Sequence, residues 1–126
     1  MEISKEEIVF QRGENGNLIP QDVVLESLEN KPTVKVVPLT RGKLQEIYQK
    51  ATSDNIQEKL EADSDIIKYG LISPKLTDEE INYLKPQMAL AITQAILSVS
   101  LGISQSEVGK KTEEMLASQE FALKKK

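Results

Sequence analysis

The chain has 126 residues and a formal net charge of -4, from 16 basic and 20 acidic side chains. This length fits one domain, 1–126, with a core of its own. Cys is absent, which excludes disulfides, thiolate metal sites and a cysteine nucleophile, and favours a reducing compartment. His is also absent, so acid–base catalysis would need a strongly shifted carboxylate, Lys or Tyr. We therefore expect no enzymatic activity.

Charges of both signs are interspersed along the chain, which leaves no basic face for a nucleic-acid backbone. The first ten residues carry Glu2, Glu6 and Glu7 and do not have the order of a signal peptide. The longest apolar stretch, 88–101, is shorter than the ~20 residues of a membrane-spanning helix. We expect a cytoplasmic protein that binds neither nucleic acid nor membranes.

The first third of the chain predicts strands and turns. Residues 8–10, followed by the Gly- and Asn-rich residues 13–17, are typical of a short strand and a tight turn. The β-rich runs 23–28 and 33–37 flank a turn and predict an antiparallel hairpin. Alternation around Lys35 indicates that the second strand is half exposed.

After residue 38 the apolar pattern takes the period of a helix. Thr40 is a suitable N-cap, and Glu46 and Lys50 are spaced to pair on the outer face. The predicted inner face comprises Leu44, Ile47, Tyr48 and Ala51.

A second helix is expected to begin near Asp54. Its predicted buried residues are Ile56 and Leu60. A short turn over 65–69 follows, and Gly70 closes it as a C-cap.

The following segment contains two more helix starts. Thr77 and Glu80 have the spacing of a capping box, and Pro86 either kinks that helix or begins a new one that Gly102 ends. Apolar side chains surround this latter helix, so it lies at the centre of the domain or in an interface. We predict self-association into a homo-oligomer through Met88, Ile92, Ile96 and Val99.

The last helix begins with a second capping box, Ser104 and Glu107. The stripe behind it is broken by Thr112 and Gln119, so packing holds it weakly. We predict that residues 104–126 form a detachable helix that engages a client protein, the alternative being an ordinary helix docked on the core. The predicted contacts are Met115, Leu116, Phe121 and Leu123.

Candidate chemical sites have simpler structural explanations. Acidic residues 78–80 follow a cap and stabilise a helix N-terminus, and residues 63–65 lack the Gly and Glu of a calcium loop. Ser104 has no His to activate it and is an N-cap. We expect no metal and no cofactor. The three Tyr residues, Tyr48, Tyr69 and Tyr83, are expected in the core or in an interface.

Together these elements predict an α+β fold. A small set of N-terminal antiparallel strands or a hairpin, within 1–38, precedes a bundle of about four to five helices. The helical core covers 40–102, and 103–126 is the loosely held C-terminal helix.

Two segments resemble a known family. Residues 35–44 read KVVPLTRGKL, and residues 67–81 read IKYGLISPKLTDEEI and are followed by LKP at 84–86. These phrases resemble the tail assembly chaperones of long-tailed phages and prophages. The resemblance covers residues 23–102, and it includes no catalytic signature.

The resemblance implies a small α+β protein that binds the tape measure protein, keeps its apolar segments soluble and helps to recruit tail tube subunits. It also implies self-association. Many members are made in addition as a longer product by ribosomal frameshifting, and here the codons of Lys124, Lys125 and Lys126 would supply the slippery run of adenines. A solvated basic terminus is the simpler explanation of those lysines. Alternatives are another virion or prophage interaction module, such as a head-to-tail joining subunit, and, less favoured, a small enzyme or a DNA-binding regulator.

Overall fold

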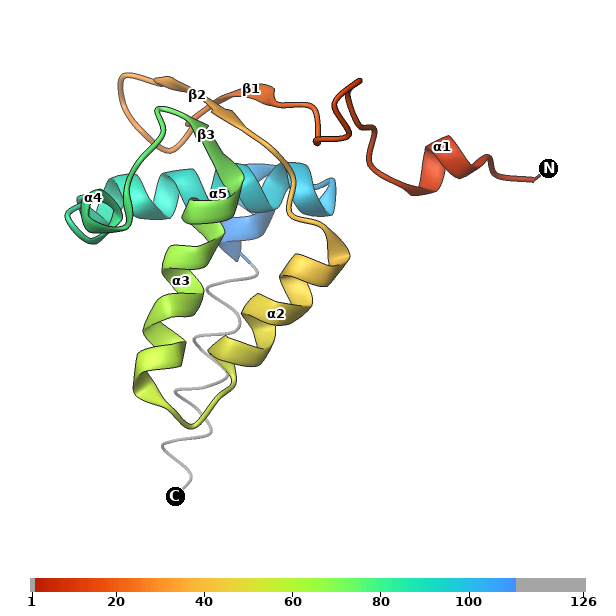
Figure 1. Ribbon diagram of the computed structural model, residues 1–126. Coiled ribbons are helices and arrows are strands. Elements are labelled where there is room, and N and C mark those ends of the chain that lie inside the picture. The colour runs from red at the N-terminus through yellow and green to blue at the C-terminus, as the bar shows by residue number, and fades with distance from the viewer. Residues whose placement is uncertain (1, 111–126) are drawn as a thin grey trace.

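The computed structural model describes residues 2–110 of the chain, and Figure 1 shows a sheet that packs on a layer of helices. This arrangement confirms the predicted α+β fold. The elements are α1 (Lys5–Ile8), β1 (Gln21–Val24), β2 (Thr33–Val36), α2 (Arg41–Ala51), α3 (Ile56–Gly70), β3 (Leu71–Ser73), α4 (Asp78–Asn82) and α5 (Pro86–Leu101). Residues 105–110 begin a further helix.

The sheet is antiparallel, in the order β1-β2-β3. The predicted hairpin is confirmed, since Val23 pairs with Val34, and Lys35 is exposed between two buried valines. The first strand is shorter than predicted because residues 25–28 turn back, with the Leu28 amide donating to Leu25 O at 3.2 Å. The sequence did not predict β3, which joins the sheet directly after α3.

The N-terminal segment forms an arm that extends from the body in Figure 1 and carries α1. The predicted strand over residues 8–10 is wrong: Ile8 ends α1, and none of the strands in the described part of the chain includes or pairs with these residues. The turn that follows is present, with Gly16 at a φ of 80°. An isolated antiparallel bridge between Arg12 and Leu18 joins the segments on the two sides of this turn.

Helices α2 and α3 lie side by side and descend from the sheet in Figure 1. Thr40 caps α2 as predicted, accepting from the Lys43 amide at 3.2 Å. α3 continues through Gly70, so the separate turn predicted over 65–69 is wrong. Those residues remain helical because Ile67 packs in the core and continues the buried face that Ala62 begins.

Helix α5 crosses beneath the sheet and forms the centre of the domain (Figure 1). Pro86 is its first residue, so of the two alternatives that the sequence left open Pro86 begins a new helix. Gly102 ends the helix with a φ of 69°, as the sequence predicts. Before it, Thr77 and Glu80 form both hydrogen bonds of the predicted capping box at the start of α4. Within residues 2–110, no helix has the length and apolar character needed to cross a membrane.

Candidate binding surfaces

The four residues predicted to contact a client lie outside the described part of the chain. These residues are Met115, Leu116, Phe121 and Leu123, and the structure describes the chain only to residue 110. The predicted contacts therefore remain predictions. The same holds for the basic residues 124–126.

The residues predicted to mediate self-association occupy different positions on α5. Ile92 and Ile96 are 3% and 0% exposed and belong to the core of a single chain. Met88 and Val99 are partly buried and pack against that core. Contact between two chains through Ile92 and Ile96 would therefore require the domain to open.

Helix α3 presents an apolar pair to solvent. Ile56 and Leu60 are 73% and 63% exposed, so the prediction that they are buried is wrong. Their spacing of four residues places them on one side of the helix, which is also the side of Ile67. The pair lies in the first turns of α3, whereas α3 reaches the core through Ala62 and Ile67 further along the helix. We call Ile56 and Leu60 the α3 surface pair.

The three tyrosines are also on the surface. Tyr48, Tyr69 and Tyr83 are all exposed, which excludes the core position that the sequence suggested as one option. Tyr69 lies beneath the Lys43 ammonium, whose nitrogen is 4.0 Å from the ring centroid. Tyr48 and Tyr83 each expose a large, partly apolar ring to solvent.

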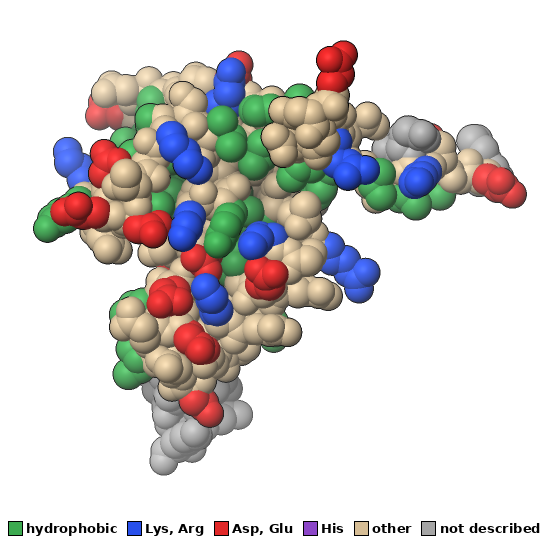
Figure 2. All heavy atoms as spheres, viewed as in Figure 1, with side chains coloured by type: hydrophobic (Ala, Val, Ile, Leu, Met, Phe, Trp, Pro, Cys, Tyr) green, Lys and Arg blue, Asp and Glu red, His purple; other side chains and the backbone are tan. Residues whose placement is uncertain are grey.

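A separate open groove lies between α3 and α5 and includes Val108 at the start of the last helix. Its apolar lining comprises Ile67, Ile81, Ala89, Leu90, Leu97 and Val108. Leu90 is one of the exposed large apolar side chains of α5. A second open hollow, at the base of the N-terminal arm, is lined by Phe10, Leu39, Leu44 and Tyr48 among others. Figure 2 shows hydrophobic side chains along that arm.

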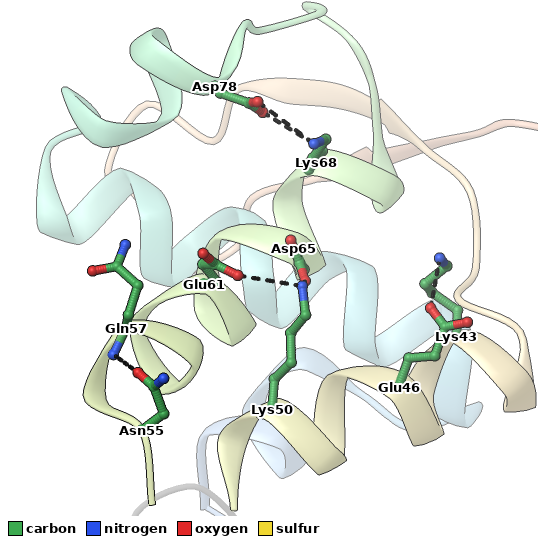
Figure 3. A network of polar contacts seen from close by, with 9 residues as sticks. All are labelled: Lys43, Glu46, Lys50, Asn55, Gln57, Glu61, Asp65, Lys68 and Asp78. Atoms are coloured by element: carbon green, nitrogen blue, oxygen red, sulfur yellow. Dashed lines mark hydrogen bonds and ion pairs between the residues drawn. The ribbon is translucent and has the colours of Figure 1, made fainter. Parts of the chain in front are cut away.

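A charged contact joins α2 to α3. Figure 3 shows Lys50 reaching from α2 toward two carboxylates of α3: its Nζ is 2.7 Å from Asp65 Oδ2 and 3.6 Å from Glu61 Oε2. The hydrogen bond to Asp65 raises the pKa of Lys50 above 10.5, although partial burial opposes this. The predicted pairing of Lys50 with Glu46 is wrong, because Glu46 accepts from Lys43 at 2.9 Å.

The same hydrogen bond from Lys43 to Glu46 raises the pKa of the Lys43 ammonium. One turn after Asp65 on α3, Lys68 Nζ lies 3.5 Å from Oδ1 of Asp78 at the start of α4 (Figure 3). Charges of both signs are therefore interspersed over α2 and α3 in Figure 2. The Lys50 and Lys68 pairs connect neighbouring helices, whereas the Lys43–Glu46 pair lies within α2. The contacts of Lys43, Lys50 and Lys68 are therefore structural ion pairs.

Two acidic side chains in the first turn of α4 have structural partners. Glu80 Oε1 accepts from the Thr77 amide at 2.9 Å, and Asp78 pairs with Lys68. Among the described residues, no three acidic side chains are placed to hold a metal ion. Ser104 acts as an N-cap, accepting from the Glu107 amide at 3.2 Å.

Sequence reasoning missed Gln105. Gln105 is only 7% exposed, and its side chain contacts the backbone of residues 24 and 26, at the end of β1 and in the turn that follows. The sequence shows only a Gln directly after the predicted N-cap Ser104, which indicates neither burial nor a particular partner. These contacts attach the start of the last helix to the sheet.

Comparison of this chain with protein-family models, curated proteins and solved structures found no match.

Proposed function

We propose that this protein acts by binding another protein through exposed apolar side chains, as a tail assembly chaperone of a long-tailed phage or prophage. Its client is the tape measure protein, with tail tube subunits as further partners. The observation that carries the proposal is the α3 surface pair, Ile56 and Leu60, which are more than half exposed although they have helical spacing. Apolar surface of this kind binds amphipathic segments of a client.

The positions of the two segments that resemble the chaperone family support the proposal. Residues 35–44 and 67–81 contact each other: the Val37 amide donates to Gly70 O at 2.9 Å, and Val36 pairs with Leu71. Lys43 also covers the ring of Tyr69. The resemblance therefore falls on one continuous unit of the fold, made of β2, α2, the end of α3, β3 and the start of α4.

A chaperone of this kind works in the cytoplasm of the host cell and is absent from the finished tail. A head-to-tail joining subunit, the alternative function, would remain in the particle. Mass spectrometry of purified particles therefore distinguishes the two functions.

A pull-down tests the client directly. The tagged chain is expressed in cells that also express the neighbouring tail genes, and the proposal predicts capture of the tape measure protein. Recovery of head or connector proteins instead would contradict it. The gene order gives an independent check, because a chaperone gene is expected between those for the major tail protein and the tape measure protein.

A further inference from the structure

Gln105 connects the last helix to the edge of the sheet through two hydrogen bonds. Its Nε2 donates to Val24 O at 2.7 Å, and its Oε1 accepts from the Glu26 amide at 3.2 Å. The side chain is almost fully buried. Both polar atoms of one side-chain amide are therefore satisfied by the backbone on the two sides of Leu25.

The Val24 carbonyl is at the end of β1, and the Glu26 amide lies two residues further on, where the chain begins to turn. The Leu25 amide donates to Pro32 O at 2.8 Å, toward β2, so the neighbouring Val24 carbonyl and Glu26 amide point the other way. In a parallel ladder, one residue bonds to the residues before and after its partner. Gln105 makes the same two contacts around Leu25. Its amide thus takes the place of one residue of a parallel strand and covers part of the edge of the sheet at β1.

Two side chains are buried at the described start of this helix, Gln105 and Val108. Val108 is buried and lines the groove between α3 and α5, whereas Ser104, Ser106 and Glu107 are exposed. The Ser104 cap lies within the helix start itself. Gln105 and Val108 are therefore the buried side chains of residues 104–108, and Gln105 is the one that bonds to the backbone of Val24 and Glu26.

We propose that Gln105 is a latch that couples the position of the last helix to the outer edge of β1. When the latch is closed, the Gln105 amide occupies the Val24 carbonyl and the Glu26 amide. When it opens, the helix start leaves the sheet, and these two groups become free to pair with an extended backbone. A ligand that binds the open state better shifts the chain toward it. The identity of this ligand rests on the proposed function: it is the tape measure protein.

Hydrogen exchange on the full chain, without any client, tests the latch. Gln105→Ala removes both bonds, so we expect the Glu26 amide to exchange about tenfold faster or more, together with the amides of residues 108–110. The Val23 amide, which faces β2, should be unchanged. Gln105→Glu keeps the acceptor but loses the donor and should give a smaller increase. Gln87→Ala is the matched control, because Gln87 is exposed at the start of α5.

Two outcomes would overturn the latch. One is an unchanged Glu26 amide in Gln105→Ala. The other is a uniform rise across the sheet with a lower unfolding midpoint, which would make Gln105 an ordinary structural residue. A melting curve for each variant separates local opening from global loss of stability.

The affinity for the tape measure protein tests the coupling to a client. Gln105→Ala populates the open state, so we expect tighter binding than by the wild-type chain, by about threefold or more. Faster Glu26 exchange with unchanged affinity contradicts this coupling. If neither chain binds the tape measure protein, the proposed function fails, and the exchange measurement still decides whether the latch exists.

Discussion

Gly70, the last residue of α3, lies against Ile96 at the centre of α5. A Cβ at residue 70 would be 2.5 Å from Ile96 Cγ2 and 2.8 Å from its Cδ1. This distance is below any normal contact between carbon atoms. Gly70 therefore allows α3 to approach the central helix before the chain turns into β3. The sequence suggested a C-cap glycine here, but the structure shows a requirement for close packing.

Replacing Gly70 should destabilise the domain. In Gly70→Ala the new methyl group overlaps a fully buried side chain, so we expect a loss of about 1–3 kcal/mol in the free energy of unfolding. Gly42→Ala is the matched control, since no atom lies within 4 Å of a Cβ there and α2 gains a better helix former. Urea denaturation measures both variants. If Gly70→Ala unfolds at the same urea concentration as the wild-type chain, the α3–α5 contact adjusts to the new methyl group without loss of stability.

Lys50 should contribute a pH-dependent stabilisation. Its folded-state pKa is raised above 10.5 by Asp65, so protonated Lys50 favours the folded state. This contribution is fully present below pH 10.5 and is lost as the pH rises through the folded-state pKa. The side chain is partly exposed, so the effect is small and screened by salt.

We therefore expect Lys50→Met to unfold at a lower urea concentration than the wild-type chain, with a gap that shrinks toward about pH 12. Lys59→Met, an exposed lysine of α3, is the control and should leave the midpoint nearly unchanged. A constant gap across the alkaline range would assign the effect of Lys50 to packing of its methylene groups.

The capping box of α4 should be measurable as well. Thr77→Ala removes the acceptor for the Glu80 amide, and a lost N-cap of this type costs about 1 kcal/mol. Thr77→Ser keeps the hydroxyl and should retain most of the stability. If both variants lose the same amount, the Thr77 methyl group rather than its oxygen stabilises α4.

Self-association of the chain should be visible in light scattering. We expect a mass above the 14.1 kDa of one chain at high micromolar concentration. Because Ile92 and Ile96 are core residues, the contact should depend on Leu90, which α5 exposes. Leu90→Lys should restore the monomer mass, and Tyr83→Lys, at another exposed position, should not. A wild-type chain that stays monomeric at all concentrations would contradict the prediction.

Local signals account for the parts of the fold that the sequence predicted. The Thr77 and Glu80 capping box, the Pro86 start and the Gly102 end of α5 depend on residues within a few positions of each other. The hairpin of β1 and β2 likewise depends on one turn. These features need no knowledge of distant partners.

The features that escaped prediction depend on distant residues. β3 becomes a strand because β2 offers an edge 35 or more positions away, as in the pair Lys35 and Ser73. Gln105 finds its partner 81 positions away at Val24. The outward position of Ile56 is a further case, because periodicity marks an apolar side of a helix without saying whether another element covers it.

The central claim is that exposed apolar residues of this chain bind a client. The most direct measurement is the soluble fraction of the tape measure protein when it is co-expressed with the wild-type chain or with the double variant Ile56→Gln, Leu60→Gln. Both residues are exposed, so the variant should fold normally, which circular dichroism and urea denaturation check. The matched control is Ile8→Gln, Ile19→Gln, two exposed residues outside α3.

The account predicts that the wild-type chain and the control keep the tape measure protein soluble and that the α3 double variant leaves it in the pellet. A tape measure protein that is equally soluble with all three chains, or equally insoluble, would contradict the account.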